Sequence, residues 1–381
     1  MKLAIFGAGL MGATIALDLV KSKQVDHVTV YDLDPRRLRI LTRRVDSAKL
    51  SAKVHDVRRS SATAQLLKEF DVGIGALPHG LSEYAIRSAI AARVNFVDLI
   101  FGWRFGQAEI NSACKRRGIT VIPACGLAPG LSNILAMKAA EQMEEVHEVH
   151  IKVGGIPEKP KPPLNYRIVF SFQAVLDEYI RKARIIRNGR MVDVPALSGL
   201  EMINFPAPIG RCECFYTDGL STLLQTIRKA RQMDEKTIRW PGHADQIRTL
   251  IDCGLLETKP LIFHNQPIMP REFVSNILSR KLALGEERDL TLLRVEVSGE
   301  RHGRKTRRRY QMIDHYDSRH RITSMARTTS FPCSIAAQIL ASGRVQQKGL
   351  VPPEIAFKGD LRDEMLDYVG RRGIIIESRS T

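Results

Sequence analysis

The sequence has no low-complexity tract, and no hydrophobic run approaches the roughly 20 residues that a membrane-spanning helix needs. Its six cysteines form no Cys-x-x-Cys pair, and Cys212 and Cys214 have no second pair nearby, so no metal site is expected. We expect reduced, mostly buried thiols. Met1 leads straight into a strand-like run rather than a secretory leader. These absences predict a cytoplasmic protein with no membrane partner.

The chain also has few acidic side chains relative to its basic ones. The chain has 58 Lys and Arg against 41 Asp and Glu, a net charge of +17. The densest basic cluster, residues 301–310, lies between two strand-like runs, 290–299 and 310–316, and no helix-turn-helix, zinc-finger or RNA-binding motif accompanies it. We therefore interpret the cluster as a solvated β-hairpin tip and expect no specific nucleic acid partner.

Near the N-terminus a Gly-x-Gly-x-x-Gly turn, Gly7 to Gly12, lies between an apolar strand-like run and an amphipathic helical run. Gly7 permits the tight turn, Gly9 lets the backbone approach a pyrophosphate, and Gly12 lets the helix pack close to the strand. Free amides and the dipole at the helix start attract the diphosphate, so Leu10 and Met11 join the expected cofactor site. This pattern predicts dinucleotide binding.

Asp32 follows Gly12 by 20 residues, at the end of the next strand-like run. A carboxylate there accepts the ribose hydroxyls and repels a 2′-phosphate, which predicts NAD as cofactor. Arg36 and Arg37 follow closely and could meet a 2′-phosphate, so NADP stays the alternative.

Residues 1–126 alternate strand-like and helical runs, which is typical of an α/β fold with a parallel, doubly wound Rossmann sheet. Ligands bind at the carboxyl ends of such strands. The expected cofactor contacts that follow later strands are Asp56 and Val57 for adenine, and Ala76, Leu77 and Pro78 for the nicotinamide ribose.

The pattern changes after residue 126. We expect an α+β substrate and dimerisation domain over 127–325, with a strand at 166–172, a helix at 220–231 and a hairpin around Asn188-Gly189. Residues 326–381 are expected to return and pack on the Rossmann domain.

Several segments, taken together and in order, resemble the L-lysine 6-dehydrogenases within the saccharopine-dehydrogenase-like superfamily. They are the glycine turn, Gly75-Ala-Leu-Pro78, Gly126-Leu-Ala-Pro-Gly-Leu-Ser-Asn133, Val153-Gly-Gly-Ile-Pro157, Tyr216-Thr-Asp-Gly219 and Lys236-Thr-Ile-Arg-Trp-Pro-Gly-His243. Saccharopine reductases typically carry Asp where this chain has Ala128, which favours the lysine-dehydrogenase branch. The resemblance implies a Rossmann domain, NAD, an amino-acid substrate and a homodimer or homotetramer.

Oxidation of an amine by hydride transfer requires a neutral nitrogen, whereas a lysine ammonium has a pKa of about 10.4. His243 is the favoured general base, with helix capping as its structural alternative. Arg239 is expected to clamp the substrate α-carboxylate. Asp218 could attract the ammonium or cap a helix. Tyr216 and Thr217, in the same segment, complete the expected substrate site.

The function that these residues and the resemblance imply is NAD-dependent oxidative deamination of the ε-amino group of L-lysine. Ammonia and NADH leave, and the aldehyde closes to piperideine-6-carboxylate. A saccharopine or carboxynorspermidine type reductase is the enzymatic alternative. An NADH-sensing regulator that binds nucleic acid through the basic cluster is the non-enzymatic one.

Overall fold

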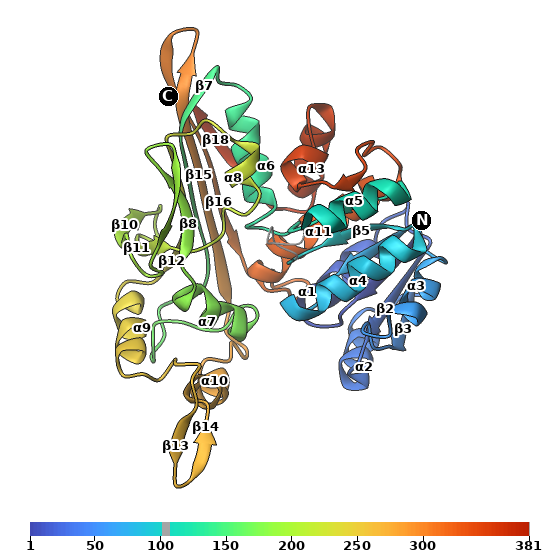
Figure 1. Ribbon diagram of the computed structural model, residues 1–381, viewed down its shortest axis with the longest axis horizontal. Helices are drawn as coiled ribbons and strands as arrows, with labels where there is room; N and C mark the ends of the chain where they lie inside the picture. The colour runs from blue at the N-terminus through green and yellow to red at the C-terminus, as the bar shows by residue number, and fades with distance from the viewer. Residues whose placement is uncertain (101–106, 381) are drawn as a thin grey trace. The chain divides into compact units, whose positions relative to one another are not determined.

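The computed structural model describes residues 1–100 and 107–380. The chain forms two compact units, coloured along the sequence in Figure 1. The first unit combines Met1–Glu141, Ser221–Ile227 and Ala326–Ile375, and the second combines Gln142–Leu220, Arg228–Met325 and Ile376–Thr381. The boundary after Glu141 lies beyond the expected one at residue 126.

The first unit contains a parallel sheet in the order β17-β6-β5-β4-β1-β2-β3, which confirms the expected doubly wound Rossmann sheet. Its strands are β1 (Lys2–Phe6), β2 (His27–Asp32), β3 (Leu50–Val54), β4 (Val72–Gly75), β5 (Asn95–Asp98), β6 (Thr120–Ile122) and β17 (Gly349–Leu350). The chain order reverses between β1 and β4, and a ligand crevice is expected at such a reversal.

Helices α1 to α5 alternate with the first six of these strands, and five further helices of the described chain belong to the same unit. They are α1 (Leu10–Leu19), α2 (Pro35–Arg44), α3 (Ser60–Leu67), α4 (His79–Ala92), α5 (Gln107–Arg117), α6 (Leu131–Ala140), α8 (Leu223–Thr226), α11 (Ser324–Ala341, which starts in the second unit), α12 (Pro353–Ala356) and α13 (Asp360–Arg371). Phe6 stacks on Tyr31 and Phe96 in the core, with ring centroids 5.4 and 6.3 Å apart. Strands buried on both faces explain the continuous apolar runs of the sequence.

The C-terminal segment belongs to this unit. Strand β17 extends the sheet beside β6, and the Ser330 hydroxyl donates to the Met11 carbonyl oxygen at 3.1 Å. Arg372 pairs with the buried Asp18 of α1 at 2.8 Å. Residues 326–375 therefore complete the first unit, whereas β18 (Glu377–Ser380) pairs with β16 in the second.

The second unit is a mixed sheet in the order β10-β11-β12-β7-β15-β16-β18, with β8 and β9 beside β12. Its other strands are β7 (Glu145–Pro157), β8 (Ala183–Arg187), β9 (Arg190–Val194), β10 (Glu201–Asn204), β11 (Arg211–Tyr216), β12 (Gln232–Arg239), β15 (Asp289–Arg301) and β16 (Arg304–His315). Three helices, α7 (Phe172–Ile180), α9 (His243–Asp252) and α10 (Pro270–Lys281), and a separate hairpin, β13 (Leu261–Phe263) with β14 (Gln266–Ile268), complete it.

The sequence predictions for this unit had mixed success. The Asn188-Gly189 hairpin is confirmed, and both residues have positive φ, as a type I′ turn requires. The strand expected at 166–172 is wrong, because only Ile168 forms a bridge and Phe172 begins α7. The helix expected at 220–231 is reduced to the four residues of α8.

The basic cluster also differs from expectation. Strands β15 and β16 continue through it, so its tip is confined to residues 301–304. Arg307 and Arg309 lie on β16 and pair with the buried Glu296 at 2.8 and 2.6 Å. Only the outer part of the cluster is a solvated tip.

Candidate active site

The glycine turn of the first unit connects β1 to α1. Gly7 has φ +106°, and a Cβ there would lie 2.3 Å from the Ala76 carbonyl oxygen. A Cβ on Gly12 would lie 1.9 Å from the Gly7 carbonyl oxygen, whereas none of the described atoms lies within 4 Å of one on Gly9. Gly7 and Gly12 therefore serve close packing, and Gly9 leaves the open space that a pyrophosphate requires. Leu10, at the start of α1, is partly exposed beside it.

Asp32, the last residue of β2, is held against this turn. Its carboxylate accepts hydrogen bonds from the Ala8 amide at 2.6 Å and the Asp34 amide at 2.8 Å. Carboxylate oxygens have further lone pairs, so Asp32 can still accept ribose hydroxyls. Arg37 lies on the exposed side of α2, with its Nε 3.8 Å from an Asp34 oxygen. These residues fit a pyridine dinucleotide.

The other expected cofactor residues follow β3 and β4. The Ala76 amide donates to the Phe6 carbonyl oxygen at 2.8 Å, so the Ala76-Leu77-Pro78 segment lies beside the glycine turn. Asp56 pairs with Arg58 at 2.8 Å, and these hydrogen bonds lower the pKa of Asp56 to about 2. Val57 is buried in the core. The adenine role of Asp56 and Val57 stays a prediction.

In the second unit, Arg239 ends β12 and is fully buried. Its guanidinium donates to the Tyr179 hydroxyl at 3.1 Å, to Glu178 at 3.2 Å, and to Thr237 Oγ1 and the Ile238 carbonyl oxygen at 3.1 and 2.9 Å. These contacts use four of the five N–H groups of an arginine. This geometry does not favour the expected bidentate clamp on a substrate carboxylate.

His243 begins α9 and is also fully buried. Its Nδ1 lies 2.6 Å from the Leu164 carbonyl oxygen, so it carries the proton, and its Nε2 accepts from the Tyr179 hydroxyl at 2.8 Å. Burial, helped by the nearby Arg239 charge, lowers the pKa of His243 to about 3. A neutral histidine with both nitrogens engaged is poorly placed to act as the general base.

Helix capping does not explain His243 either. The amide of Gly242, directly before α9, and the amide of Ala244, in its first turn, donate to the Glu213 carboxylate at 2.7 and 2.6 Å. Glu213 on β11 therefore caps the helix, and His243 joins Tyr179 and Arg239 in one buried hydrogen-bonded chain.

A second group of charges lies around the end of β11. Asp218 is bound by Arg184 through two hydrogen bonds of 2.9 and 3.0 Å, and Arg181 is 3.5 Å away. Thr217 donates to the buried carboxyl of Glu235 at 2.8 Å. Burial, together with the nearby charges of Glu178 and Asp218, raises the pKa of Glu235 to about 8. At neutral pH this carboxyl is mostly protonated.

The structure thus brings Thr217 and Asp218 together but places Tyr216 elsewhere. The Tyr216 ring packs against Gly199, where a Cβ would lie 2.3 Å from a ring carbon. The Lys236 ammonium lies 4.6 Å from the centre of the same ring. Lys236 neighbours Glu235 along β12, and successive side chains of a strand point to opposite faces. Tyr216 therefore lies on the other face of the sheet from Glu235.

Sequence reasoning missed Glu178, Tyr179, Arg184 and Glu235. A usable signal was present for one of them, because Glu235, Thr237 and Arg239 alternate on β12 and so share one face. Glu178 and Tyr179 were missed because α7 was not predicted.

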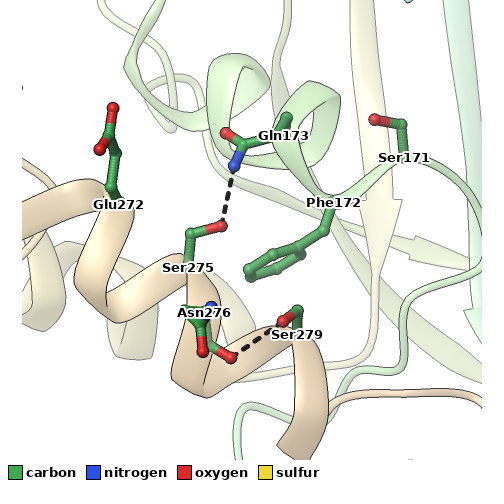
Figure 2. Close-up of a pocket in the computed structure, with 7 residues that line it drawn as sticks. All are labelled: Ser171, Phe172, Gln173, Glu272, Ser275, Asn276 and Ser279. Atoms are coloured by element: carbon green, nitrogen blue, oxygen red, sulfur yellow. Dashed lines mark hydrogen bonds between the residues drawn. The ribbon is translucent and has the colours of Figure 1, made fainter.

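A groove of about 320 Å³ lies between the start of α7 and α10 (Figure 2). Gln173 donates across it to the Ser275 hydroxyl at 3.0 Å, and its other lining residues include Phe172 and Glu272. It contains none of the expected site residues. Among the described residues, Glu145, His147 and Glu300 could approach one metal ion; Glu145 is exposed and the other two are half-buried. No helix of the described residues is both long and apolar enough to span a bilayer.

Comparison with protein families matches both parts of the chain. Residues 3–122 match the saccharopine dehydrogenase NADP binding domain, and residues 126–374 match the saccharopine dehydrogenase C-terminal domain. The chain belongs to the saccharopine dehydrogenase family.

Individual relatives agree. Mitochondrial alpha-aminoadipic semialdehyde synthase of Rattus norvegicus is 21% identical over 453 residues, covering 100% of this chain and 48% of that protein. Saccharopine dehydrogenase [NADP(+), L-glutamate-forming] of Saccharomyces cerevisiae is 27% identical over 248 residues, covering 61% of this chain and 54% of that protein. The chain thus spans about half the length of these curated relatives.

A solved structure of saccharopine dehydrogenase (L-Glu forming) from Saccharomyces cerevisiae superimposes with a TM-score of 0.82 at 20% identity, covering 100% of this chain and 99% of that one. This likeness confirms the fold. The comparisons therefore establish the saccharopine dehydrogenase family, and not the narrower group of L-lysine 6-dehydrogenases that the motifs resemble.

Proposed function

We propose that this chain is a pyridine-nucleotide-dependent dehydrogenase that oxidises the ε carbon–nitrogen bond of lysine, or of an amine derived from it. The observation that carries the proposal is that the Asp32 carboxylate is held against the glycine turn by a 2.6 Å hydrogen bond from the Ala8 amide. The chain in which this occurs belongs to the saccharopine dehydrogenase family. Within this proposal the favoured reaction is oxidative deamination of L-lysine with NAD.

The first unit would hold the nucleotide. The α1 amides and Gly9 would receive the pyrophosphate, and Asp32 would receive the ribose hydroxyls. When bound, the nicotinamide accepts the hydride that leaves the carbon. NAD is favoured because the fixed carboxylate of Asp32 would repel a 2′-phosphate. NADP is the alternative cofactor. The match of residues 3–122 to a saccharopine dehydrogenase NADP binding domain and the NADP(+) named for the yeast relative support it, and Arg36 or Arg37 would then bind the 2′-phosphate.

The group of charges around the end of β11, which includes Asp218 and Glu235, would hold the substrate amine. Asp218 would attract the substrate ammonium, and we propose Glu235 as the group that takes the ammonium proton. A carboxyl with a pKa of about 8 exchanges its proton close to neutral pH, as a general base must. His243 and Arg239 would act as positioning residues that hold Tyr179 and Glu178 in place.

The reaction balances with one water molecule. The ammonium loses a proton to the base, and the carbon loses a hydride to the nicotinamide, which leaves a carbon–nitrogen double bond. Water then cleaves that bond to an aldehyde and ammonia. With saccharopine in place of lysine, the same steps would release an amino acid instead of ammonia, and the names of the relatives favour this second candidate.

A spectrophotometric screen of reduced-nucleotide formation separates these possibilities. Lysine, ornithine, saccharopine and diamines would each be offered with NAD and with NADP. We expect turnover with lysine and NAD. Turnover with saccharopine alone, and reverse turnover only when the aldehyde and an amino acid are both supplied, would support the reductase type. No turnover with any amine would contradict the proposal.

A further inference from the structure

The start of β7 and the end of β15 form one corner of the mixed sheet in the second unit (Figure 1). At this corner Glu145 on β7 lies directly opposite Glu300 on β15. Like charges directly opposite each other in an antiparallel pair are destabilising. A cation between the two carboxylates would turn this repulsion into attraction.

A β-bulge places a histidine beside these carboxylates. The register shifts between Ser298 and Gly299, because His147 is an extra residue on β7 with no partner on β15, a strand that the structure describes in full. A bulge redirects a side chain. Here it directs the imidazole to the carboxylates, and Nε2 lies 3.5 Å from the nearest oxygen of Glu145 and 3.8 Å from that of Glu300.

The Nε2 atom of His147 is buried and has no hydrogen-bond partner among the described residues. Its distances to the two carboxylates exceed the roughly 3.2 Å at which an N–H···O hydrogen bond ends. Buried polar atoms in proteins are almost always partnered. The space between the imidazole and the two carboxylates is therefore where a partner would lie.

The spacing of these three groups fits a zinc ion. Their ligand atoms all lie within 4.8 Å of one another. Zinc bonds to nitrogen and oxygen are about 2.0–2.2 Å long, so neighbouring ligands of a tetrahedral ion lie about 3.4 Å apart. Both distances from His147 are close to this value, and an imidazole ligand favours zinc over magnesium or calcium. The absence of a metal site was expected from the cysteine spacing, and none of these ligands is a cysteine.

Further acidic side chains lie around the three ligands. Glu144 precedes Glu145 along the chain, and its carboxylate lies 3.3 Å from His302 Nδ1. Glu148 lies 3.7 Å from His150 Nε2. Together with the opposed pair, these residues place four carboxyl groups at the described corner of the sheet. This surplus favours a divalent cation.

Basic side chains approach the same corner. Arg231 lies 3.4 Å from Glu145, and its side chain is 68% exposed. Lys305 lies opposite Glu300 in the β15–β16 pair and is exposed as well. Arg301 follows Glu300 directly, so its side chain points to the other face of the sheet. Exposed ion pairs are weak, so an ion can displace Arg231 at little cost.

We propose that Glu145, His147 and Glu300 bind a zinc ion that joins β7 to β15. His147 binds through Nε2 and each glutamate through one oxygen. A groove of about 530 Å³, lined in part by His147 and Arg231, admits the water that completes the coordination. The ion stabilises this end of the sheet because it removes the repulsion between the two carboxylates. The site is independent of the reaction catalysed.

The test is zinc binding by the full-length protein in a Cys253→Ser background, which lacks the exposed thiol. EDTA-treated protein is titrated with zinc chloride, and the heat of binding is measured. We expect one ion per chain and a dissociation constant that rises at least about a hundredfold in His147→Gln, since even the loss of a group that only orients a metal ligand costs roughly 10–100-fold. Glu145→Gln, at an exposed position, should have the same effect and covers a His147→Gln variant that fails to fold.

His302→Gln is the matched control. Among the described residues His302 contacts one glutamate, Glu144, and no opposed pair, so its loss should leave zinc binding unchanged. X-ray absorption at the zinc edge should show nitrogen and oxygen at about 2.0–2.2 Å and no sulfur at about 2.3 Å.

Stability measurements separate the zinc site from a simple ion pair. Without zinc, Glu300→Gln should be at least as stable to denaturant as the parent, because it removes one of two opposed charges. With zinc the parent should be the more stable protein, since zinc binds its folded state. No zinc binding, a His147→Gln variant that binds zinc as tightly as the control, sulfur ligands, or a Glu300→Gln variant that is destabilised without zinc would overturn the proposal.

Discussion

The glycine turn with Asp32 in the first unit and the network of buried charged side chains in the second unit are built in different ways. The first uses backbone amides, glycines and one carboxylate, and most of these come from a single strand–turn–helix–strand segment. The second uses polar and charged side chains from α7, β8, β12 and the residues directly after β11, and these meet only in the folded chain. Local backbone geometry tolerates sequence change except at its glycines, whereas a buried charge network depends on every partner. Substitutions should therefore have different consequences in the two regions.

The largest expected effect is on stability, at Arg239. Arg239→Met would leave Glu178 with an uncompensated negative charge and should lower the free energy of unfolding by about 3 kcal/mol. Denaturant unfolding measures this change. Arg239→Met with Glu178→Gln should recover part of the loss, and a single variant as stable as the wild type would show that the network is dispensable.

The next effect is on turnover, at Glu235. Glu235→Gln keeps the hydrogen bond from Thr217 but removes the base, and should lower the turnover number by about 10²–10⁴-fold. The wild-type rate should rise with pH through about 8, where Glu235 loses its proton, and the variant should lack this rise. An unchanged pH profile would transfer the base role to Asp218 or water.

The same carboxyl gives a pH-dependent stability of known sign. Its pKa is about 8 in the folded protein, well above the 4.5 of a freely solvated glutamate, so the folded state binds the proton more strongly. The free energy of unfolding should therefore fall as pH rises between these values. In Glu235→Gln that fall should be smaller, and an equal slope in both proteins would refute the raised pKa.

Cofactor choice is the corresponding test of the first unit. We expect NAD to be used at least about tenfold more efficiently than NADP, since the Asp32 carboxylate repels a 2′-phosphate. Asp32→Gly should narrow the gap, measured as the ratio of kcat/KM values. Equal efficiency in the wild type would mean that Arg36 or Arg37 governs the site.

The smallest effect should come from the basic cluster. Neutralising Arg307, Arg308 and Arg309 together should leave turnover unchanged and weaken retention on a polyanion column. Because Glu296 loses its partners Arg307 and Arg309, a modest loss of stability should accompany it. Lost turnover in a folded variant would contradict a role confined to the surface.

The two regions also differ in what the sequence could predict. The Rossmann sheet and glycine turn were predicted correctly because their signals are local: a fixed glycine spacing, alternating strands and helices, and Asp32 at a strand end. Glu178 and Tyr179 could not be predicted, because no helix was expected where α7 lies. Arg239 and His243 were expected from the sequence as site residues, but the sequence carried no information on their burial, which depends on packing between α7, α9 and β12.

The most direct test of the proposed reaction follows the hydride. Lysine deuterated at C6, or at C2, is offered with NAD, and the reduced nucleotide is analysed by mass spectrometry. The proposal predicts deuterium in NADH from C6-labelled lysine only, with a slower turnover for that substrate. Deuterium from C2-labelled lysine, or no NADH at all, would contradict oxidation at the ε carbon.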